Sequence, residues 1–536
     1  MMAQVEIYDT TLRDGTQGLA FTLTSEDKVA IAQRLDSFGV DYIEGGWPGS
    51  NPKDATFFEM MKDVRLVRAR LAAFSMTRRK NTAVEDDVNM KALLEAETPV
   101  ATIVGKSWTL HVTDALGTTL DENLAMIQDS VAYMKAQGKT VIYDAEHFFD
   151  GYRADDMYAL ATLEAAASGG ADCIVLCDTN GGSMPADVVS ILQASQARVQ
   201  TPLGIHTHND CEMAVANTLA AVQAGAMHVQ GTINGYGERC GNANLISIIP
   251  NLVLKLGYDQ PQDLRALRDL SHYIDERANL QPNTRAAYVS DAAFAHKGGM
   301  HVSAVNKNPE TYEHVHPERV GNQRRILLSD LSGRANVLAK TDDQEASDPN
   351  VQANMQAVVT KLKELENRGY AFEGAEASFK LMSQKVRGEY HPYFLLHGFN
   401  INITKRDNDP RPVAEATIKV GVGDQLEHTA ANGDGPVNAL DKALRKALMR
   451  FYPMLQELSL VDYKVRVLSG LESGTASVVR VLVETTDGRD TWGTVGASTD
   501  VIAASYEALT DAIEYKLLKD EVKPETPAGF DVTVHS

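Results

Sequence analysis

The stretch VEIYDTTLRDG, residues 5–15, sets the pattern of the first half of the chain, because a short β-branched run leads directly into polar, loop-forming residues. Further runs of this kind follow to about residue 256, separated by amphipathic helical stretches. In the first of these stretches, Ser25 is predicted to cap the helix and Gly39 to end it. The eight runs cover residues 5–9, 42–46, 71–76, 100–105, 140–145, 173–178, 203–208 and 227–234.

Eight β–α units in roughly 250 residues is the size of a (β/α)8 TIM barrel, with a doubly wound open sheet as the alternative. Beyond about residue 378 the hydrophobic pattern changes to that of alternating strands, with helices beginning near Pro436 and Val501. This pattern predicts an α+β domain with a duplicated strand-strand-helix unit. We therefore expect an α/β protein with a barrel at 1–270, a helical linker region at 271–378 with an acidic linker at 341–350, an α+β domain at 379–525 and a tail at 526–536.

The composition excludes several classes of partner. The 536 residues include 72 acidic and 51 basic side chains, which gives a net charge of −21 that repels nucleic acid and anionic membranes. No uninterrupted apolar run is long enough to span a membrane and the first residues do not form a secretory signal, so a cytoplasmic protein is expected. The four cysteines contain no CxxC pair, which argues against a disulfide framework or a zinc ribbon.

A metal site is predicted where the first and seventh runs end. His206 and His208, in HTHND, are two residues apart on a strand and therefore point to the same face, and Asp14 lies just beyond the first run. In a barrel these positions meet at one rim. Two histidines and a carboxylate suit a divalent cation with open positions for substrate, and Asn242 in GYGERCGN could add an oxygen ligand.

Three more residues follow strand-like runs at the same predicted rim. Arg13 could stabilise an oxyanion formed on a metal-bound carbonyl, or form a salt bridge across the barrel mouth. Glu146 could take part in proton transfer. Thr179, in CDTNGG, offers a hydroxyl to a carboxylate, although a plain helix-entry turn would explain it equally well.

Other motifs are less specific. GYGERCGN does not have the spacing of a dinucleotide-binding loop, and no phosphate-binding GxxxxGK[ST] sequence occurs. The basic cluster 78–80 could meet a phosphorylated ligand such as coenzyme A, or be an ordinary solvated turn. His296 and His301, in FAHKGGMH, are by themselves more typical of structural histidines.

Together, DTTLRDGTQ, HTHND and GERCGN resemble the signature of the pyruvate-carboxylase-like metal-dependent barrels that include 2-isopropylmalate, homocitrate and citramalate synthases. FAHKGGMH and LLSDLSGRANV are similar to the region that follows the barrel in those synthases, and the C-terminal part resembles their amino-acid-binding regulatory domain. The resemblance covers nearly the whole chain. EGGWPGSNPKD, residues 44–54, is similar to the citramalate synthase branch.

The resemblance implies an acyltransferase that condenses acetyl-CoA with a 2-keto acid, pyruvate in this branch, and then hydrolyses the thioester to release (R)-citramalate and CoA. It implies that Mg²⁺ or Mn²⁺, with Zn²⁺ possible, is held by the predicted ligands, that Tyr143 and Thr179 bind substrate, and that Arg13 stabilises the alkoxide. Glu146 and His301 would handle the proton of the acetyl methyl group, His301 reaching with Tyr312 from another subunit; which of the two is the base stays open.

The resemblance also implies a homodimer whose C-terminal domain binds isoleucine, the end product of the pathway, as an inhibitor. Glycines before a helix expose backbone donors to a carboxylate, so the effector is placed at GDGPVNAL and GTVGASTD, with Gly435, Pro436, Gly496 and Ala497. A plain dimerisation domain is the alternative. For the barrel, the alternatives are another keto acid such as 2-oxoisovalerate or 2-oxoglutarate, a reverse 3-hydroxy-3-methylglutaryl-CoA-type lyase, an Fe(II) oxygenase, and a catalytically silent metabolite sensor.

Overall fold

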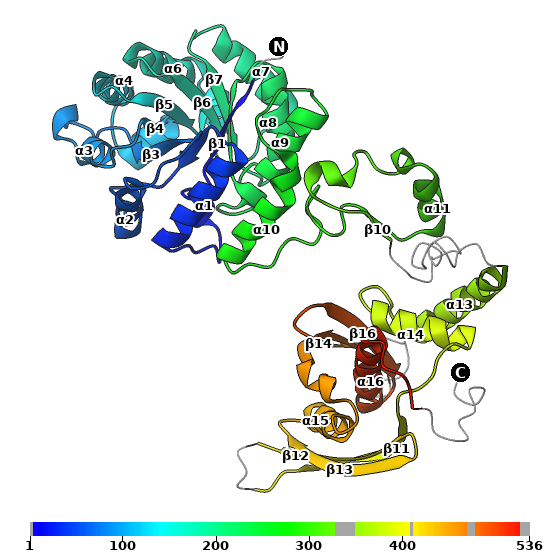
Figure 1. Cartoon of the computed structure of the whole chain (residues 1–536). Coiled ribbons are helices and arrows are strands. Elements are labelled where there is room, and N and C mark those ends of the chain that lie inside the picture. Colours follow the sequence, from blue (N-terminus) through cyan, green and yellow to red (C-terminus); the bar gives the residue numbers. More distant parts are fainter. Residues whose placement is uncertain (1–3, 327–348, 408–410, 469–476, 526–536) are drawn as a thin grey trace. The chain divides into compact units, whose positions relative to one another are not determined.

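The computed structural model describes residues 4–326, 349–407, 411–468 and 477–525. The chain divides into two compact units (Figure 1). The first, the barrel unit, comprises Met1–Phe294 and Glu313–Arg324, and the second, the C-terminal unit, comprises Ala295–Tyr312 and Arg325–Ser536. Each unit is described below by itself.

The barrel unit contains a closed barrel of eight parallel strands in sequence order. Tyr8 in the first strand pairs with Tyr42 in the second and with Gln230 in the eighth, so the sheet has no free edge. This closure confirms the predicted (β/α)8 fold and rules out the doubly wound alternative. The strands are β1 (Glu6–Asp9), β2 (Tyr42–Glu44), β3 (Arg70–Met76), β4 (Val100–Lys106), β5 (Thr140–Glu146), β6 (Cys173–Asp178), β7 (Leu203–Thr207) and β8 (His228–Gly231).

Helices surround the barrel on its outer side (Figure 1). The first helix begins at Ser25, and its N-cap is Thr24 rather than the predicted Ser25. The Thr24 hydroxyl accepts from the Asp27 amide, and the Asp27 carboxylate accepts from the Thr24 amide. Gly39 ends this helix with φ 102°, as predicted. The helices are α1 (Ser25–Phe38), α2 (Pro52–Met61), α3 (Val88–Glu95), α4 (Leu120–Ala136), α5 (Phe148–Ala154), α6 (Asp156–Gly169), α7 (Pro185–Gln196), α8 (Ala214–Gln223), α9 (Leu245–Leu254) and α10 (Leu267–Arg277).

The strands separate two buried layers. Their outer faces pack against the helices in a large apolar core, and their inner faces form a small cluster that includes Tyr8, Tyr42, Ile142 and Val175. Because successive side chains of a strand alternate between these layers, position along the strand decides which residues face the barrel interior. Polar side chains follow the apolar inner cluster at the carboxyl ends of the strands, where the candidate site lies.

The segment after α10 is less helical than predicted. It contains a two-stranded parallel sheet of β9 (Ala295–His296) and β10 (Arg325–Ile326), with α11 (Gly299–Lys307) between them. The helices α13 (Pro349–Asn367) and α14 (Glu376–Arg387) follow. Most of the predicted acidic linker at 341–350 lies outside the described residues.

The C-terminal part repeats one arrangement, three antiparallel strands followed by a helix. The predicted duplication is therefore present, with three strands in each copy. The helices begin at Pro436 and Val501, as the sequence indicated. No helix in the described ranges is both long and apolar enough to cross a membrane. The first copy is β11 (Leu395–Thr404), β12 (Val413–Val422), β13 (Gln425–Gly433) and α15 (Pro436–Leu448), and the second is β14 (Ser459–Val467), β15 (Val479–Thr486), β16 (Thr491–Ser498) and α16 (Val501–Lys519).

Candidate active site

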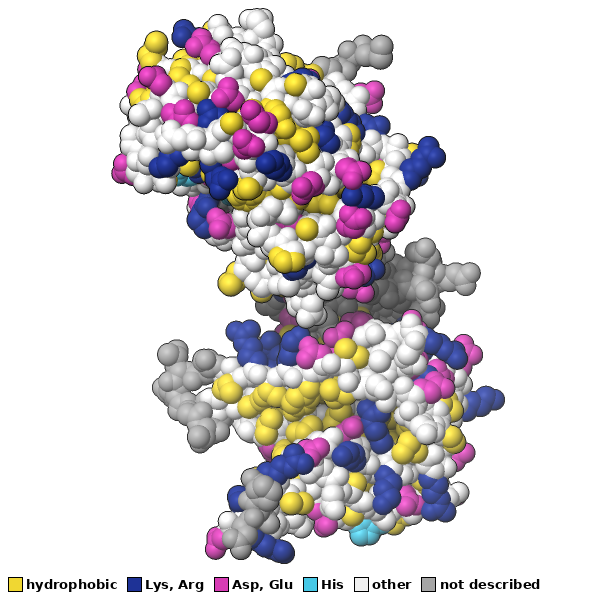
Figure 2. Space-filling view, turned by 90° about the vertical axis from the view of Figure 1, so that its left-hand side faces the viewer, with side chains coloured by type: hydrophobic (Ala, Val, Ile, Leu, Met, Phe, Trp, Pro, Cys, Tyr) yellow, Lys and Arg dark blue, Asp and Glu magenta, His cyan; other side chains and the backbone are white. Residues whose placement is uncertain are grey.

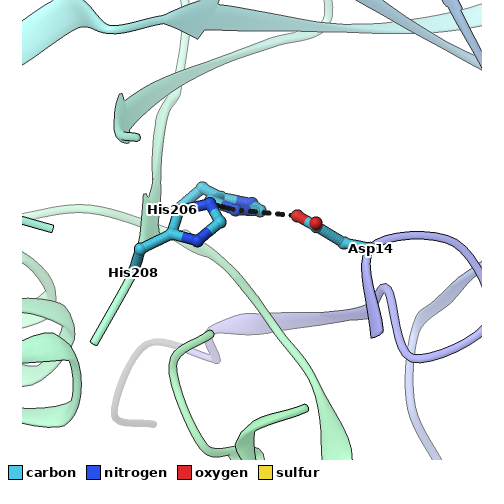
Figure 3. Close-up of side chains that lie close together, drawn as sticks. All are labelled: Asp14, His206 and His208. Atoms are coloured by element: carbon cyan, nitrogen blue, oxygen red, sulfur yellow. Dashed lines mark hydrogen bonds and ion pairs between the residues drawn. The ribbon is translucent and has the colours of Figure 1, made fainter. Parts of the chain in front are cut away.

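Asp14, His206 and His208 converge at the carboxyl-terminal end of the barrel (Figure 3). One candidate ligand atom from each residue lies within 4.8 Å of the other two. His206 Nε2 is 3.3 Å from Asp14 Oδ2 and 3.2 Å from His208 Nε2. All three side chains are buried. The predicted constellation is thus brought together by the loop after β1 and by the end of β7.

The electrostatics of Asp14 and His208 suit a bound cation, whereas the contact with Asp14 raises the pKa of His206 despite its burial, so that His206 would have to lose its proton to bind one. Burial alone would raise the pKa of Asp14, but the charge of Arg13 and the hydrogen bond from His206 hold it well below its usual value. Burial and the neighbouring His206 lower the pKa of His208 to about 3, so His208 is neutral near pH 7. An ionised carboxylate beside a neutral imidazole is the protonation pattern that a metal ion requires of its ligands.

Two further observations support a metal site. Among the described residues, His208 Nδ1 and Asn242 Oδ1 are buried without a hydrogen-bond partner. Asn242 pairs with His208 in an isolated β-bridge, which places its amide beside the cluster. Gln230 orients His206, since its Oε1 lies 2.8 Å from His206 Nδ1 and its Nε2 donates to Asp144 Oδ1 at 2.9 Å. This bond leaves His206 Nε2 free to act as a ligand.

Arg13 is held by a buried carboxylate that the sequence reading missed. Its Nε donates to Glu44 Oε2 at 2.7 Å, and the guanidinium lies 4.0 Å from the centre of the Phe74 ring. Glu44 is fully buried at the end of β2 and also accepts from the Tyr8 hydroxyl at 2.7 Å and from the Thr10 hydroxyl. Arg13 NH1 also lies 3.5 Å from Asp14 Oδ2. The guanidinium therefore forms salt bridges and is rigidly placed beside the candidate ligands.

Glu146 and Thr179 both lie at the predicted rim. Glu146 ends β5 and forms an ion pair with Lys106 at the end of β4, a partner that was not predicted. The Thr179 hydroxyl accepts from the His147 amide at 2.9 Å, directly after β6. His147 has φ 53°, so the turn that carries this amide is in the left-handed region.

The structure does not support Tyr143 as a substrate-binding residue. Tyr143 is fully buried in the apolar core between strands and helices, and a Cβ added at Gly105 would lie 2.6 Å from its hydroxyl. Asp144, its neighbour in β5, faces the barrel interior instead, where it bonds to Gln230. Burial raises the pKa of Asp144 to about 7. Both faces of a barrel strand are buried, so the sequence does not distinguish Tyr143 from its inward-facing neighbour Asp144.

His301 and Tyr312 belong to the C-terminal unit, where the centres of their rings lie 4.2 Å apart and the ring planes are tilted by 30°. In the barrel unit, the charges of the basic cluster 78–80 have protein partners. Arg78 is buried and pairs with Glu122 and Asp129, and Lys80 donates to two backbone carbonyls. This favours the turn interpretation of the cluster over coenzyme A binding.

The four predicted effector residues have different surroundings. Gly435 caps α15, Pro436 is its first residue, and a Cβ at Gly435 would meet nothing within 4 Å. Gly496 and Ala497 lie within β16. A Cβ at Gly496 would lie 2.0 Å from the Ala504 carbonyl oxygen, so close packing of β16 on α16 accounts for this glycine.

Comparisons with known proteins decide the family. The HMGL-like family model matches residues 4–274, the homocitrate synthase post-HMGL domain-like model matches 288–370, and the LeuA allosteric (dimerisation) domain model matches 373–517. An (R)-citramalate synthase of Geobacter sulfurreducens is 55% identical over 525 residues, which are 97% of this chain and 99% of the relative. The chain belongs to the (R)-citramalate synthase family. A second member, from Aquifex aeolicus, is 53% identical over 97% of this chain and 99% of its own length.

Membership of the (R)-citramalate synthase family makes the chain an enzyme of the acyltransferase class, which sets aside the metabolite-sensor alternative. The family is related to other synthases: a probable 2-isopropylmalate synthase of Methanopyrus kandleri is 32% identical over 96% of this chain and 98% of its own. The predicted resemblance to this group of barrels is confirmed.

Proposed function

We propose that the chain condenses acetyl-CoA with pyruvate and hydrolyses the thioester, releasing (R)-citramalate and CoA. The observation that carries the proposal is the convergence of Asp14, His206 and His208 beside Arg13 at the barrel rim, in a chain of the (R)-citramalate synthase family. In the reaction, the acetyl methyl group loses a proton, its carbon bonds to the keto carbon of pyruvate, and the keto oxygen takes a proton. Water then cleaves the thioester.

Asp14, His206 and His208 would hold a divalent metal ion, Mg²⁺ or Mn²⁺, with Asn242 close by. When bound, such an ion polarises a carbonyl and fixes its orientation. Arg13 would stabilise the developing oxyanion, because its guanidinium is immobilised by Glu44 and pays little reorganisation cost during the reaction. Thr179 would donate its hydroxyl hydrogen to the keto-acid carboxylate, since its oxygen already accepts from the His147 amide.

Either Glu146 or His301 is the base that removes the proton of the acetyl methyl group. The contact with Lys106 fixes the Glu146 carboxylate at the rim, whereas the His301 ring contacts the Tyr312 ring in the C-terminal unit. Deuterium exchange of the acetyl-CoA methyl group separates the two, because it reports proton removal without condensation. The variant of the true base, Glu146→Gln or His301→Asn, is expected to lose this exchange, and the other variant to retain it.

The deciding experiment follows release of the CoA thiol from acetyl-CoA. Purified protein with Mg²⁺ or Mn²⁺ receives pyruvate, 2-oxobutyrate, 2-oxoisovalerate, 2-oxoglutarate or glyoxylate in separate reactions. Fastest release with pyruvate, abolished by a chelator, is the expected result. Faster release with 2-oxoisovalerate would move the chain to the 2-isopropylmalate reaction. Cleavage of 3-hydroxy-3-methylglutaryl-CoA to acetyl-CoA and acetoacetate, with no thiol release from acetyl-CoA and any of the keto acids, would favour the lyase.

We further propose a homodimer formed through the C-terminal unit and inhibited by isoleucine. The match of residues 373–517 to an allosteric, dimerisation domain supports the dimer. Hydrophobic side chains gather on the face of this unit that is turned to the viewer in Figure 2. The unit's exposed apolar residues include Phe399, Ile403, Val461, Val465 and Val467 on β11 and β14, edge strands that are open to pairing.

The effector proposal rests on the Gly435 end of α15, where a Cβ added at Gly435 would meet nothing within 4 Å and where the first turn of a helix leaves backbone donors unpaired. Gly435→Val is expected to weaken inhibition by isoleucine without lowering basal turnover. Inhibition that survives both this substitution and truncation near residue 375 would leave the C-terminal unit as a plain dimerisation domain.

A further inference from the structure

Arg239 connects the three loops that follow β6, β7 and β8. Its Nε donates to Asp210 Oδ1 at 2.7 Å and its NH2 to Asp210 Oδ2 at 2.9 Å, a bidentate pair. The same NH2 donates to the Thr179 carbonyl oxygen at 2.7 Å. Asp210 lies two residues after the candidate ligand His208. One guanidinium thus holds the turn that carries Thr179 against the loop that follows the metal-binding strand.

The surrounding backbone is built for this contact. Arg239 has φ 55°, in the left-handed region that a residue with a side chain adopts only at a cost. Gly181, with φ 62°, approaches so closely that a Cβ would lie 2.5 Å from Asp210 Oδ2 and 2.9 Å from the Asp210 nitrogen. The Cys211 thiol lies 2.8 Å from the Gly181 carbonyl oxygen. These contacts distinguish Arg239 from a mobile surface arginine, which a salt bridge alone would not do.

Thr179 is consequently fixed from two sides. Arg239 holds its carbonyl oxygen, and the His147 amide, itself in a left-handed turn, donates to its hydroxyl oxygen. The hydroxyl can then direct its hydrogen only away from His147, towards a ligand. A binding group that is already oriented in the free protein loses less conformational entropy on binding, which raises the affinity for a small anion that makes few contacts.

We propose that Arg239 is a positioning residue that acts through Thr179 on binding of the keto-acid carboxylate. The inference rests on the proposed function, in which Thr179 contacts that carboxylate. Among the described residues, no hydrogen bond or ion pair joins Arg239 to Asp14, His206 or His208. Its charge acts on His208 and Asp14 only at a distance and is balanced by Asp210, so the affinity for the metal is expected to change less than threefold.

The test is a double-substitution cycle. Arg239→Gln is expected to raise KM for pyruvate about tenfold with kcat changed less than threefold, and Thr179→Val to raise KM similarly. The KM of the double variant is expected to be no higher than that of the poorer single variant, because Arg239 acts only through Thr179.

Two further variants serve as controls. Arg239→Lys keeps the charge but not the bidentate guanidinium, so its KM should lie between those of wild type and Arg239→Gln. Arg198→Gln is the matched control: Arg198 is 41% exposed, as Arg239 is, and pairs with Glu164 on α6 instead.

If the two single effects multiply in the double variant, to about a hundredfold in KM, the two residues act independently and the proposal is overturned. So would a tenfold weaker affinity for Mn²⁺ in Arg239→Gln, measured by competition with a chelator, since Arg239 would then act through the metal ligands. If another keto acid proves to be the substrate, the cycle is run with that acid. If wild type turns over none, the proposed function fails by itself, and hydrogen exchange at amides 179–184 tests whether Arg239 fixes the turn that carries Thr179. Faster exchange in Arg239→Gln but not in Arg198→Gln supports this role, and equal exchange refutes it.

Discussion

Glu44 in the barrel unit and Glu514 in the C-terminal unit are both almost fully buried, but their partners differ. Glu44 accepts from the cationic Arg13 as well as from Tyr8 and Thr10. Glu514 accepts from the neutral Tyr390 hydroxyl, at 2.6 and 2.7 Å, and burial raises its pKa to about 7. Glu44 is thus held in a buried charge pair next to the candidate site, whereas the charge of Glu514 changes near neutral pH, as that of Asp144 in the barrel does.

Replacing the cation of the barrel pair is expected to have the largest effect. Arg13→Met leaves the buried Glu44 without its charged partner and Asp14 without its neighbour. Loss of one partner of a buried pair costs about 3–5 kcal/mol of unfolding free energy. Loss of the oxyanion donor lowers kcat by about 10²–10³-fold. Urea unfolding and CoA release measure the two effects, with Arg34→Met, an exposed pair on α1, as the control. A variant of unchanged stability would show that the pair does not stabilise the fold.

Replacing the anion of the same pair sharpens this result. Glu44→Gln can keep the contacts to Tyr8 and Thr10 but removes the charge that immobilises Arg13. Asp14 still lies 3.5 Å from Arg13, so we expect a smaller loss of stability, about 3 kcal/mol, and a fall in kcat of about 10²-fold. Unfolding and turnover are measured as before. If Glu44→Gln is as active as wild type, Glu44 does not position Arg13 for catalysis.

The two regions also differ in how far the sequence predicts them. Asp14, His206 and His208 were predicted because alternation along a strand and the common rim of a barrel are rules of geometry. Tyr143 was not distinguished from the inward-facing Asp144, because β5 is buried on both faces and polarity does not reveal which face points inward. Glu44 was missed although it is the one charged residue of the run 42–46, a signal that could have identified it as inward-facing. Gln230 stands among other polar residues in MHVQGTIN, so its run gave no such signal.

In the C-terminal unit the patterns predicted the elements but not their chemistry. The helix starts at Pro436 and Val501 follow from strand-to-helix changes in periodicity. Whether Gly496 binds an effector or permits close packing depends on the backbone of α16, which is contributed by a later segment. The same holds for Glu514, since its partner Tyr390 is 124 residues away in the chain.

The protonation of Glu514 predicts a pH-dependent stability. Burial is the main cause of the shift from 4.5 to about 7, against the weaker opposing effects of Lys385 and Tyr390. Between these pH values the folded chain binds the proton more tightly than the unfolded chain, so the free energy of unfolding falls as pH rises through this window. Above pH 7 the loss amounts to about 3 kcal/mol. Glu514→Gln is expected to match wild type at pH 4.5 and to be more stable by up to that amount at pH 8, measured by urea unfolding followed at the C-terminal unit. Parallel pH profiles for the two proteins would contradict the assignment.

Removing the hydroxyl partners is expected to have the smallest effect and compares the two carboxylates directly. A hydrogen bond to a neutral group contributes about 1 kcal/mol and one to a charged group about 2 kcal/mol. Tyr390→Phe should therefore cost about 1 kcal/mol at pH 5, where Glu514 is protonated, and about 2 kcal/mol at pH 8, where it is ionised. Tyr8→Phe is the matched change in the barrel, because its acceptor Glu44 is paired with Arg13, and we expect its cost to be the same at both pH values. Equal pH dependence in the two variants would mean that the Arg13 pair does not distinguish the barrel carboxylate from Glu514.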